Sequence, residues 1–317
     1  MEPERRSMHC DISSLIIGNA KLAGAITLSS EPICVAKLDN VLGEGPCWDE
    51  ASGRLYWFDI KGLRLHWLDH SSQAVDFASL PYRGSAAAPR ASGGLILATE
   101  RGIAAWDSQA RTLSLLAPIA HPPGFRSNDG KIDVGGRFWW SMMDDAAIRP
   151  GFIGRYDADG RCTRMIEGVT IPNTLACSPD GRMFYYADSS LNALFACELD
   201  PRSGAFLSPP RELAHTRGQA GGPDGSAVDE DGFIWNAQWG LSRVVRYAPD
   251  GRIDRIVPFP VEQPSSCAFG GPDLDTLYVT SAMDGLDGPR LKASPLSGGL
   301  FALRPGVRGL RLPAFAG

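Results

Sequence analysis

Four residues with oxygen-bearing side chains recur at one position of a repeat that runs through this chain. Asn128, Asn173 and Asp224 each lie eight residues before a turn glycine, and Glu44 lies nine residues before Gly53, in a copy whose turn is one residue longer. Residues at one phase of a radially repeated fold converge on its axis. Carboxylate and amide oxygens that meet there are suitable ligands for a hard cation. The spacing therefore predicts a metal site at the centre of the fold.

Each of these residues could instead serve only as a turn former. Gly43-Glu-Gly-Pro46 and Gly222-Pro-Asp-Gly225 resemble turns, in which Asp and Asn side chains bond to nearby backbone. The shared register favours the metal site, since only the two copies with Ala86 and with Ser266 or Cys267 lack such a residue. Unpaired acids at a narrow axis would repel one another, and a divalent cation removes that cost. A ligand set made only of oxygen atoms favours calcium, magnesium or manganese. Zinc or iron would be expected at a histidine-rich site.

The repeat itself predicts the architecture that positions these residues. Segments rich in aromatic and β-branched residues follow six turns, whose anchors are Gly53, Gly94, Gly136, Gly181, Gly232 and Asp275. Each segment follows a strand of small residues and precedes a further strand, and the anchors lie 41 to 51 residues apart. That spacing accommodates four short strands with their loops. We therefore expect an all-β fold, a six-bladed β-propeller; a β-sandwich would not need one unit repeated six times.

The two ends of the chain are expected to meet in one blade. Residues 32–39 read as a strand that precedes the first copy. This strand would supply the outer strand of the last blade and leave the ring without an open edge. The expected organisation is thus a poorly ordered N-terminal extension over residues 1–30 and a single propeller domain over residues 31–317.

Composition narrows the partners and the compartment. The net charge of −5 and the pI near 5.6 argue against a nucleic-acid or anionic-membrane surface, and no apolar run approaches the roughly 18–20 residues of a membrane span. Seven cysteines, an odd number without a C-x-x-C pair, argue against a disulfide framework and a structural zinc site. The N-terminus lacks the apolar core of a signal peptide. We expect a cytoplasmic protein without an obligate protein partner.

Other catalytic motifs are absent from the sequence. There is no G-x-S-x-G elbow and no P-loop, and Gly43-Glu-Gly45 does not continue into a dinucleotide-binding fingerprint. None of the histidines sits at the axial position or shows metal-ligand spacing, and each is expected to be an ordinary surface or loop residue: His9, His66, His70, His121 and His215.

Several motifs, in order along the chain, resemble the regucalcin/gluconolactonase family of sugar-lactone hydrolases. They are Leu42-Gly-Glu-Gly-Pro46, Arg126-Ser-Asn-Asp-Gly-Lys131, Ile171-Pro-Asn-Thr174 and Pro223-Asp-Gly225. The resemblance covers roughly residues 32–304. Within the family, the chain is most similar to bacterial aldonolactonases such as xylonolactonase, a likeness carried by the stretches Pro223 to Gly240, Cys267 to Leu274 and Thr276 to Tyr278.

The resemblance implies specific roles for individual residues. The Glu, Asn and Asp that hold the family's metal match Glu44, Asn173 and Asp224. The family's substrate-contacting Arg and Asn match Arg126 and Asn128, and this Asn can also reach the metal through water. An acidic residue that contacts sugar hydroxyls in the family matches Asp145, at the end of the stretch Ser141-Met-Met-Asp-Asp145.

These roles imply a metal-dependent hydrolysis of an aldonolactone to the aldonic acid. The metal, for which Ca²⁺ is favoured and Zn²⁺, Mn²⁺, Mg²⁺ and Fe²⁺ stay open, would polarise the lactone carbonyl. Arg126 and Asn128 would orient the substrate, and Asp224 would accept a proton from the attacking water. Two alternatives remain: a calcium-dependent esterase or organophosphate hydrolase of the same fold, and a non-catalytic metal-binding propeller.

Overall fold

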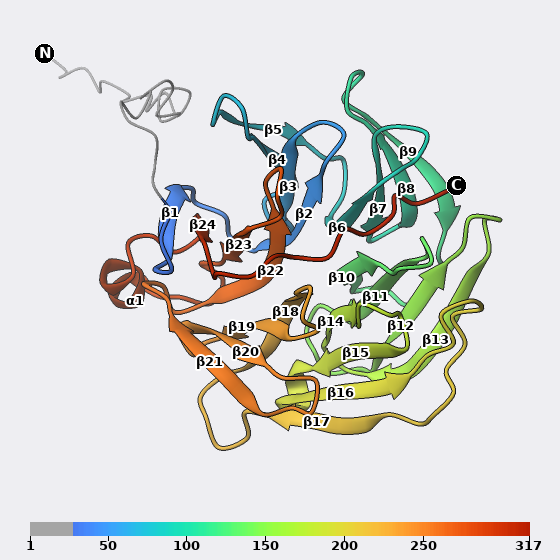
Figure 1. Ribbon diagram of the computed structural model, residues 1–317. Helices are drawn as coiled ribbons and strands as arrows, with labels where there is room; N and C mark the ends of the chain where they lie inside the picture. Colours follow the sequence, from blue (N-terminus) through green and yellow to red (C-terminus); the bar gives the residue numbers. More distant parts are fainter. Residues whose placement is uncertain (1–27) are drawn as a thin grey trace, which may run out of the picture.

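The computed structural model describes residues 28–317, within which six sheets of four antiparallel strands surround one axis (Figure 1). The expected six-bladed β-propeller is therefore confirmed. The expectation of a poorly ordered extension falls mainly on residues 1–27, which lie outside the described residues. In the described part, no helix combines the length and the apolar character needed to cross a membrane.

Each blade contributes one strand to each of four concentric layers. The innermost strands are β2 (Gly43–Asp49), β6 (Gly84–Pro89), β10 (Phe125–Ile132), β14 (Pro172–Cys177), β18 (Gly222–Val228) and β22 (Pro264–Gly270). The second strands are β3 (Arg54–Asp59), β7 (Leu95–Thr99), β11 (Phe138–Asp144), β15 (Met183–Asp188), β19 (Ile234–Trp239) and β23 (Thr276–Ser281). The third strands are β4 (Arg64–Asp69), β8 (Gly102–Asp107), β12 (Gly151–Tyr156), β16 (Ala193–Glu198), β20 (Arg243–Tyr247) and β24 (Leu300–Leu303). The outermost strands are β5 (Val75–Ser79), β9 (Thr112–Pro118), β13 (Cys162–Val169), β17 (Arg211–His215), β21 (Ile253–Pro258) and β1 (Ile33–Ala36). A 3₁₀ turn (Ser189–Leu191) and a short helix, α1 (Gly288–Ala293), lie between strands.

The ring closes in the way that the sequence predicted. Strand β1, from the N-terminal side, pairs antiparallel with β24, the last strand of the chain, and completes the blade of β22 and β23. The innermost strands contact one another in the circular order β2, β6, β10, β14, β18, β22 and back to β2. The side-chain positions at the start of every innermost strand therefore face a common axis.

The hydrophobic core lies between the blades. Each of the buried clusters of the described residues joins side chains of two neighbouring blades. Between the third and fourth blades, for example, the rings of Trp139 and Phe184 are 4.3 Å apart. Large aromatic residues on the second strands fill these wedge-shaped spaces, whereas the crowded inner strands carry small residues, as in the Gly84–Pro89 strand. This packing fixes the blades rigidly around the axis.

The C-terminal segment closes one end of the channel along the axis. It crosses the ring from the fifth blade to the second, forming backbone bridges from Gly309 to Asp229 and from Phe315 to Arg90 (Figure 1). Above it lies a cavity of about 390 Å³, lined by the last residues of the innermost strands and by residues 310–314. We call this the tail end of the channel, and the end where the innermost strands begin the site end.

Two expectations about residue types have different outcomes. The six cysteines of the described residues are free. This agrees with the expectation, drawn from their odd number and spacing, that the chain has no disulfide framework. The prediction that every histidine is a surface or loop residue is wrong for His66, which lies within β4 and is only 3% exposed. Its ring is stacked on Trp57 at 5.2 Å and covered on the other side by Phe77, because the middle strand of a blade is enclosed by its neighbours.

Candidate functional site

A β-bulge near the start of each innermost strand positions the predicted residues. The register shifts fall between Glu44 and Cys47, Gly84 and Ala86, Ser127 and Gly130, Asn173 and Ala176, Pro223 and Ser226, and Pro264 and Ser266. Glu44 and Asn173 are the last paired residues before their bulges, and Asn128 and Asp224 lie inside theirs. A bulge bends the strand and redirects its side chains. The same local feature therefore presents all four residues at the site end.

The bulges require unusual backbone conformations. Gly45 has φ +58°, and a Cβ at this position would lie 2.0 Å from the carbonyl oxygen of Ser85 in the next blade. Thr174 and Leu175 have φ of 79° and 42°, which is uncommon for residues with a side chain. Thr174 is held by a hydrogen bond of 2.7 Å from its Oγ1 to the carbonyl oxygen of Asp224. Strain of this kind persists where the surrounding structure enforces it, and it clusters at functional sites.

Three buried carboxylates converge on the axis from blades that are not neighbours. Glu44 lies on β2, Asp129 on β10 and Asp224 on β18. Burial, together with the charge of Asp129, raises the pKa of Glu44 to about 8. Burial, with the charges of Glu44 and Asp129, raises the pKa of Asp224 well above its ordinary value. Burial is the larger cause of both shifts, and the smaller effect of each charge on the other carboxylates indicates that these residues of alternate blades face one channel.

Asp129 was not assigned a role from the sequence. It is 1% exposed, and its Oδ2 has no hydrogen-bond partner among the described residues. Burial raises the pKa of Asp129 to about 6, against the opposing effects of Lys131 and of the backbone N–H groups of Gly130 and Thr174. In the sequence, only its position next to Asn128 pointed to Asp129. In a regular strand, side chains alternate between the two faces, so Asp129 would have been expected on the face opposite to that of Asn128.

Two cations face this acidic cluster. The charges of Arg126 and Lys131 both lower the pKa of Glu44, which places them near the same carboxylate. The Lys131 Nζ donates a hydrogen bond of 3.1 Å to the carbonyl oxygen of Cys267, and Lys131 also lines the cavity at the tail end. A lysine in an inner strand of small residues was a signal that sequence reasoning missed, because a charge there must have a partner. Three acids thus face two cations within the protein.

A chain of hydrogen bonds joins the predicted substrate-binding residues to a predicted metal ligand. Arg126 Nη1 donates to Asn128 Oδ1 at 2.6 Å. Asn128 Nδ2 donates to Asn173 Oδ1 at 2.8 Å and to the carbonyl oxygen of Pro172 at 3.0 Å. Asn173 Nδ2 in turn donates to Ser189 Oγ at 2.9 Å. Asn128 therefore presents its nitrogen, and not its oxygen, to Asn173.

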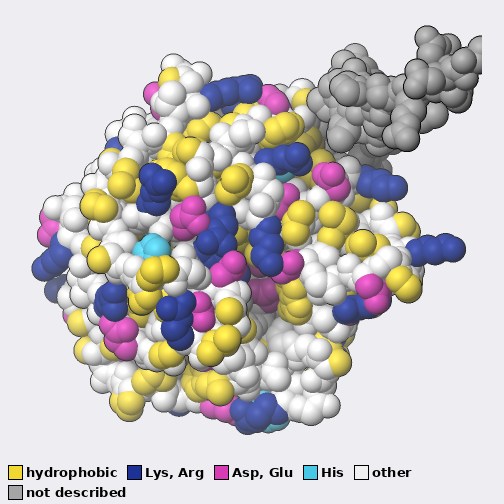
Figure 2. Space-filling view, turned by 180° about the vertical axis from the view of Figure 1, so that it is seen from behind, with side chains coloured by type: hydrophobic (Ala, Val, Ile, Leu, Met, Phe, Trp, Pro, Cys, Tyr) yellow, Lys and Arg dark blue, Asp and Glu magenta, His cyan; other side chains and the backbone are white. Residues whose placement is uncertain are grey.

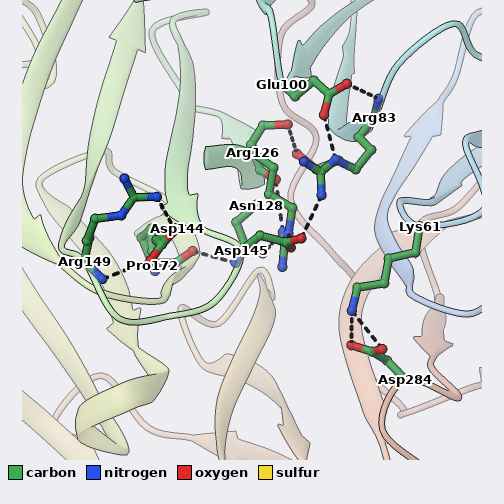
Figure 3. A network of polar contacts seen from close by, with 12 residues as sticks. Lys61, Arg83, Glu100, Arg126, Asn128, Asp144, Asp145, Arg149, Pro172 and Asp284 are labelled. Atoms are coloured by element: carbon green, nitrogen blue, oxygen red, sulfur yellow. Dashed lines mark hydrogen bonds and ion pairs between the residues drawn. The ribbon is translucent and has the colours of Figure 1, made fainter. Parts of the chain in front are cut away.

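The same chain extends outward to the rim of the site end (Figure 3). Arg126 Nε donates to Asp145 Oδ1 at 2.6 Å, and Arg83 Nη1 donates to Asp145 Oδ2 at 2.9 Å. Arg83 Nε donates to Glu100 at 2.6 Å. Burial alone would raise the pKa of Asp145, but the hydrogen bonds from Arg126 and Arg83 lower it below its ordinary value. Arg83, like Asp129 and Lys131, had no role predicted from the sequence.

Two further ion pairs flank the opening without joining this chain. Lys61 Nζ lies 2.8 Å from Asp284, and Arg149 Nη2 lies 2.7 Å from Asp144 (Figure 3). On the face opposite to that of Figure 1, basic and acidic side chains gather around a hollow near the centre (Figure 2). The site end is thus a polar opening, whereas the cavity at the tail end is lined largely by apolar residues such as Phe269.

The side chains at the site end fit a divalent cation with oxygen ligands. Residues 28–317 contain no group of three or more His, Cys, Asp or Glu side chains that could hold a metal ion. Any cation here would therefore rely on the two carboxylates of Glu44 and Asp224 and on the amide oxygen of Asn173. Burial is the main cause of the raised pKa values of Glu44 and Asp224, and neighbouring carboxylates add to it. A hard cation supplies positive charge to such carboxylates and prefers such oxygens.

Comparisons with known proteins give a consistent result. Residues 42–283 match the family model described as the SMP-30/Gluconolactonase/LRE-like region. The chain is 38% identical over 292 residues to 6-deoxy-6-sulfogluconolactonase of Pseudomonas putida, covering 90% of this chain and 98% of the relative. It is 34% identical over 288 residues to L-arabinolactonase of Azospirillum brasilense, covering 89% and 95%. The crystal structure of regucalcin from Agrobacterium tumefaciens, described as a calcium-binding protein, superposes with a TM-score of 0.86 at 35% identity, covering 89% and 96%.

Proposed function

Because this chain belongs to the SMP-30/gluconolactonase/LRE-like family, we propose that it hydrolyses a sugar lactone to the corresponding aldonic acid with the help of one divalent metal ion. The observation that carries this proposal is the meeting of Glu44 and Asp224 from separate blades, next to Asn173 and within the influence of Arg126. A cation-binding set beside a guanidinium group suits a neutral substrate that develops negative charge on one oxygen.

The names of the relatives support a sugar lactone as the substrate class. Two of them are named as lactonases of different sugars, L-arabinose and a sulfonated gluconic acid derivative. A polyhydroxylated lactone needs polar partners around its ring, and the site end supplies them from Arg126, Asn128 and Asp145. An aryl ester or an organophosphate would favour a more apolar opening.

The metal, when bound, supplies Lewis acidity at the lactone carbonyl. Glu44, Asn173 and Asp224 would hold it, and their oxygen-only chemistry favours Ca²⁺. The regucalcin of similar structure is described as calcium-binding, which agrees with this choice.

The side chains of this chain bind and orient the substrate and move the proton. Arg126 is buried and rigidly held by Asp145, so its guanidinium group can hydrogen-bond the substrate without a large loss of side-chain entropy. Asn128 fixes the amide of Asn173. Asp224 accepts a proton from the attacking water, since its buried carboxylate lies at the site end, where the water would attack.

The test is a pH-drop assay with a panel of five- and six-carbon aldonolactones, corrected for spontaneous hydrolysis. We expect turnover that is lost on treatment with EDTA and restored by Ca²⁺ or another divalent ion. An aryl ester and an organophosphate serve as competing substrates. Turnover of the aryl ester or the organophosphate alone would assign the chain to the esterase type. Metal binding without any turnover would indicate a non-catalytic propeller.

A further inference from the structure

Arg83 occupies a position at the rim that the proposed roles do not explain. We propose that Arg83 is a further substrate-contacting residue, which together with Arg126 binds an oxygen acceptor on the exocyclic carbon of the lactone and so determines specificity. This inference rests on the proposed lactonase function and adds to it the part of the substrate that is recognised.

The two guanidinium groups are held as a pair by one carboxylate. Asp145 Oδ1 accepts from Arg126 Nε at 2.6 Å, and Asp145 Oδ2 accepts from Arg83 Nη1 at 2.9 Å. Arg83 belongs to the second blade and Asp145 to the loop after β11 of the third blade, so the contact spans the rim between blades. Both carboxylate oxygens of Asp145 are thereby engaged. The donors that remain for a ligand belong to the arginines.

Each guanidinium group keeps donor capacity after its contacts within the protein. Arg83 uses Nε for Glu100 and Nη1 for Asp145. Arg126 uses Nε for Asp145 and Nη1 for Asn128 and the carbonyl oxygen of Ser127. Among the described residues, neither Nη2 has an acceptor. Since five N–H donors of a guanidinium group point in fixed directions, these remaining donors are preoriented for an oxygen acceptor.

The exposure of the chain of contacts increases toward the rim. The Arg126 side chain is 7% exposed, that of Arg83 is 23% exposed and that of Asp145 is 35% exposed. A lactone whose carbonyl points toward Glu44 and Asp224 has its ring next to Arg126. Its exocyclic substituent, the group that projects beyond the ring, can then lie beside Arg83. The position of Arg83 on the solvent side of Arg126 is what this geometry requires.

A purely structural role accounts poorly for this arrangement. Partly exposed ion pairs contribute little to stability, because solvent screens them and the side chains must be ordered. Glu100 already holds Arg83 through the backbone N–H of Arg83, at 3.3 Å, and through Nε. The additional contact with Asp145 of another blade adds little to folding, but it fixes the two guanidinium groups relative to each other.

The acceptor can be a neutral hydroxyl or an anionic group. Arg83 and Arg126 are balanced by Asp145 and Glu100, so the four side chains carry no net charge and do not exclude either type. Both types present an oxygen acceptor to the remaining N–H donors. A carboxylate or sulfonate would form a charge-assisted hydrogen bond, which is stronger than one to a hydroxyl group.

The test uses the holoenzyme and the substitution Arg83→Met, which keeps the aliphatic stem and removes the donors. Glucono-1,5-lactone and xylono-1,5-lactone differ only in the exocyclic hydroxymethyl group and form a matched pair. We expect KM for gluconolactone to rise about 10-fold to 100-fold, as for the loss of a hydrogen bond to a charged group. We expect kcat for gluconolactone to stay within about threefold of the wild-type value. The same holds for kcat and KM with xylonolactone, because a threefold change is too small to indicate a lost hydrogen bond.

A third lactone, with a carboxylate in place of the hydroxymethyl group, separates the two sources of the acceptor. If the acceptor is anionic, the wild-type enzyme prefers this lactone to gluconolactone, and Arg83→Lys retains part of the preference through its charge. If the acceptor is a hydroxyl group, gluconolactone is preferred and Arg83→Lys behaves as Arg83→Met does.

The control is Arg149→Met, which removes another arginine at the same opening. The partner of Arg149 is Asp144, which lies outside the chain of contacts that joins Arg83 to Arg126. We expect it to leave the ratio of the two KM values unchanged. Equal losses on gluconolactone and xylonolactone in Arg83→Met, or an unchanged ratio of KM values, would show that Arg83 does not contact the exocyclic group. If the wild-type enzyme turns over no lactone at all, the proposed function itself is wrong, which is a distinct result.

Discussion

Asn128 holds Asn173 through its nitrogen, with Asn128 Nδ2 lying 2.8 Å from Asn173 Oδ1 across the boundary between the third and fourth blades. The orientation of this amide is fixed, because Arg126 occupies Asn128 Oδ1 at 2.6 Å. Asn173 Oδ1 has two lone pairs, so it can accept this hydrogen bond and still serve as a ligand. Under the proposed function, Asn128 would therefore orient the proposed metal ligand Asn173 in addition to its proposed role in binding substrate.

Replacement of Asn128 by Ala should weaken metal binding. Loss of a hydrogen bond that orients a ligand costs about 10-fold to 100-fold in metal affinity. Isothermal titration of the metal-free protein with Ca²⁺ measures this loss. The control is Gln219→Ala, which removes an exposed amide bound to Arg243 at the same end of the fold. An unchanged Ca²⁺ affinity in Asn128→Ala would mean that Asn173 is oriented without it.

Replacement of Asp224 by Asn separates the proposed base from the proposed ligand. Asn keeps an oxygen in place but cannot accept a proton, so we expect kcat to fall about 10²-fold to 10⁴-fold. The dissociation constant for the metal should change by a much smaller factor. Steady-state kinetics at saturating metal, with a metal titration of the same protein, measure the two effects.

The matched variant for this test is Glu44→Gln, which alters a proposed ligand without a proton-transfer role. Its activity should recover in excess metal, whereas that of Asp224→Asn should not. If excess metal restores both variants equally, Asp224 acts only as a ligand.

The stability of the metal-free protein should decrease as the pH rises. Burial raises the pKa of Glu44 from 4.5 to about 8 and raises that of Asp224. Between these pH values the unfolded chain has lost protons that the folded protein still holds, so the free energy of unfolding falls with rising pH and is lowest above pH 8. Bound metal offsets this loss. Thermal unfolding in EDTA and in Ca²⁺ should therefore show a gap in Tm that is larger at pH 8 than at pH 5.

The variant Glu44→Gln provides the control for the pH experiment. Without the Glu44 carboxylate, the slope of Tm against pH in EDTA should become shallower. A gap between the EDTA and Ca²⁺ curves that does not change with pH would contradict the idea that these carboxylates take up the metal.

His66 should lower the free energy of unfolding as the pH falls below about 6.5. Burial lowers the pKa of His66 to about 4. The unfolded chain therefore binds a proton between pH 6.5 and pH 4 that the folded protein does not, and stability falls as the pH falls through this window. We expect His66→Phe, which can retain the stacking on Trp57, to flatten this part of the curve by up to roughly 3 kcal/mol. Urea unfolding at pH 7.5 and pH 4.5 measures the difference, and equal slopes in both proteins would refute it.

Phe315 should matter for stability and not for catalysis. It is 1% exposed, is stacked on Tyr156 at 5.5 Å, and anchors the C-terminal segment in the core between the second and third blades. Phe315→Ala should cost about 3–5 kcal/mol in urea unfolding, as a large cavity does, and Phe315→Leu should cost less. The kcat of the folded protein should be unchanged, because the segment lies at the tail end. If kcat falls in a Phe315→Ala protein that is fully folded, the prediction is wrong, and the tail end of the channel influences catalysis at the site end.

Much of the fold could be predicted because the unit is repeated. Six turns followed by aromatic strands predicted the six blades. The strand at residues 32–39, which precedes the first copy of the repeat, predicted the pairing of β1 with β24. The crossing of the channel by the C-terminal segment was not predicted. Residues 305–317 have no strand pattern of their own, and their place depends on the contacts of Phe315 with blades far away in the sequence.

The candidate site could be predicted only in part. The spacing singled out Glu44, Asn128, Asn173 and Asp224, and the structure brings them to one end of the channel. Asp129 was missed because the bulge between Ser127 and Gly130 breaks the alternation of the strand. Arg83 was missed because its partner Asp145 lies 62 residues away in another blade.

The amino-acid sequence by itself determined the repeated unit, the number of blades and the phase at which oxygen-bearing side chains occur, since these depend on local spacing and on turn chemistry. Only the tertiary structure decided which charges face one another. Closing the ring brings Glu44, Asp129 and Asp224 from alternate blades to a common axis and removes them from water, and it is this burial at close range that raises their pKa values. Electrostatic interaction depends on distance and solvent exposure, and neither quantity exists until the blades have closed around the channel.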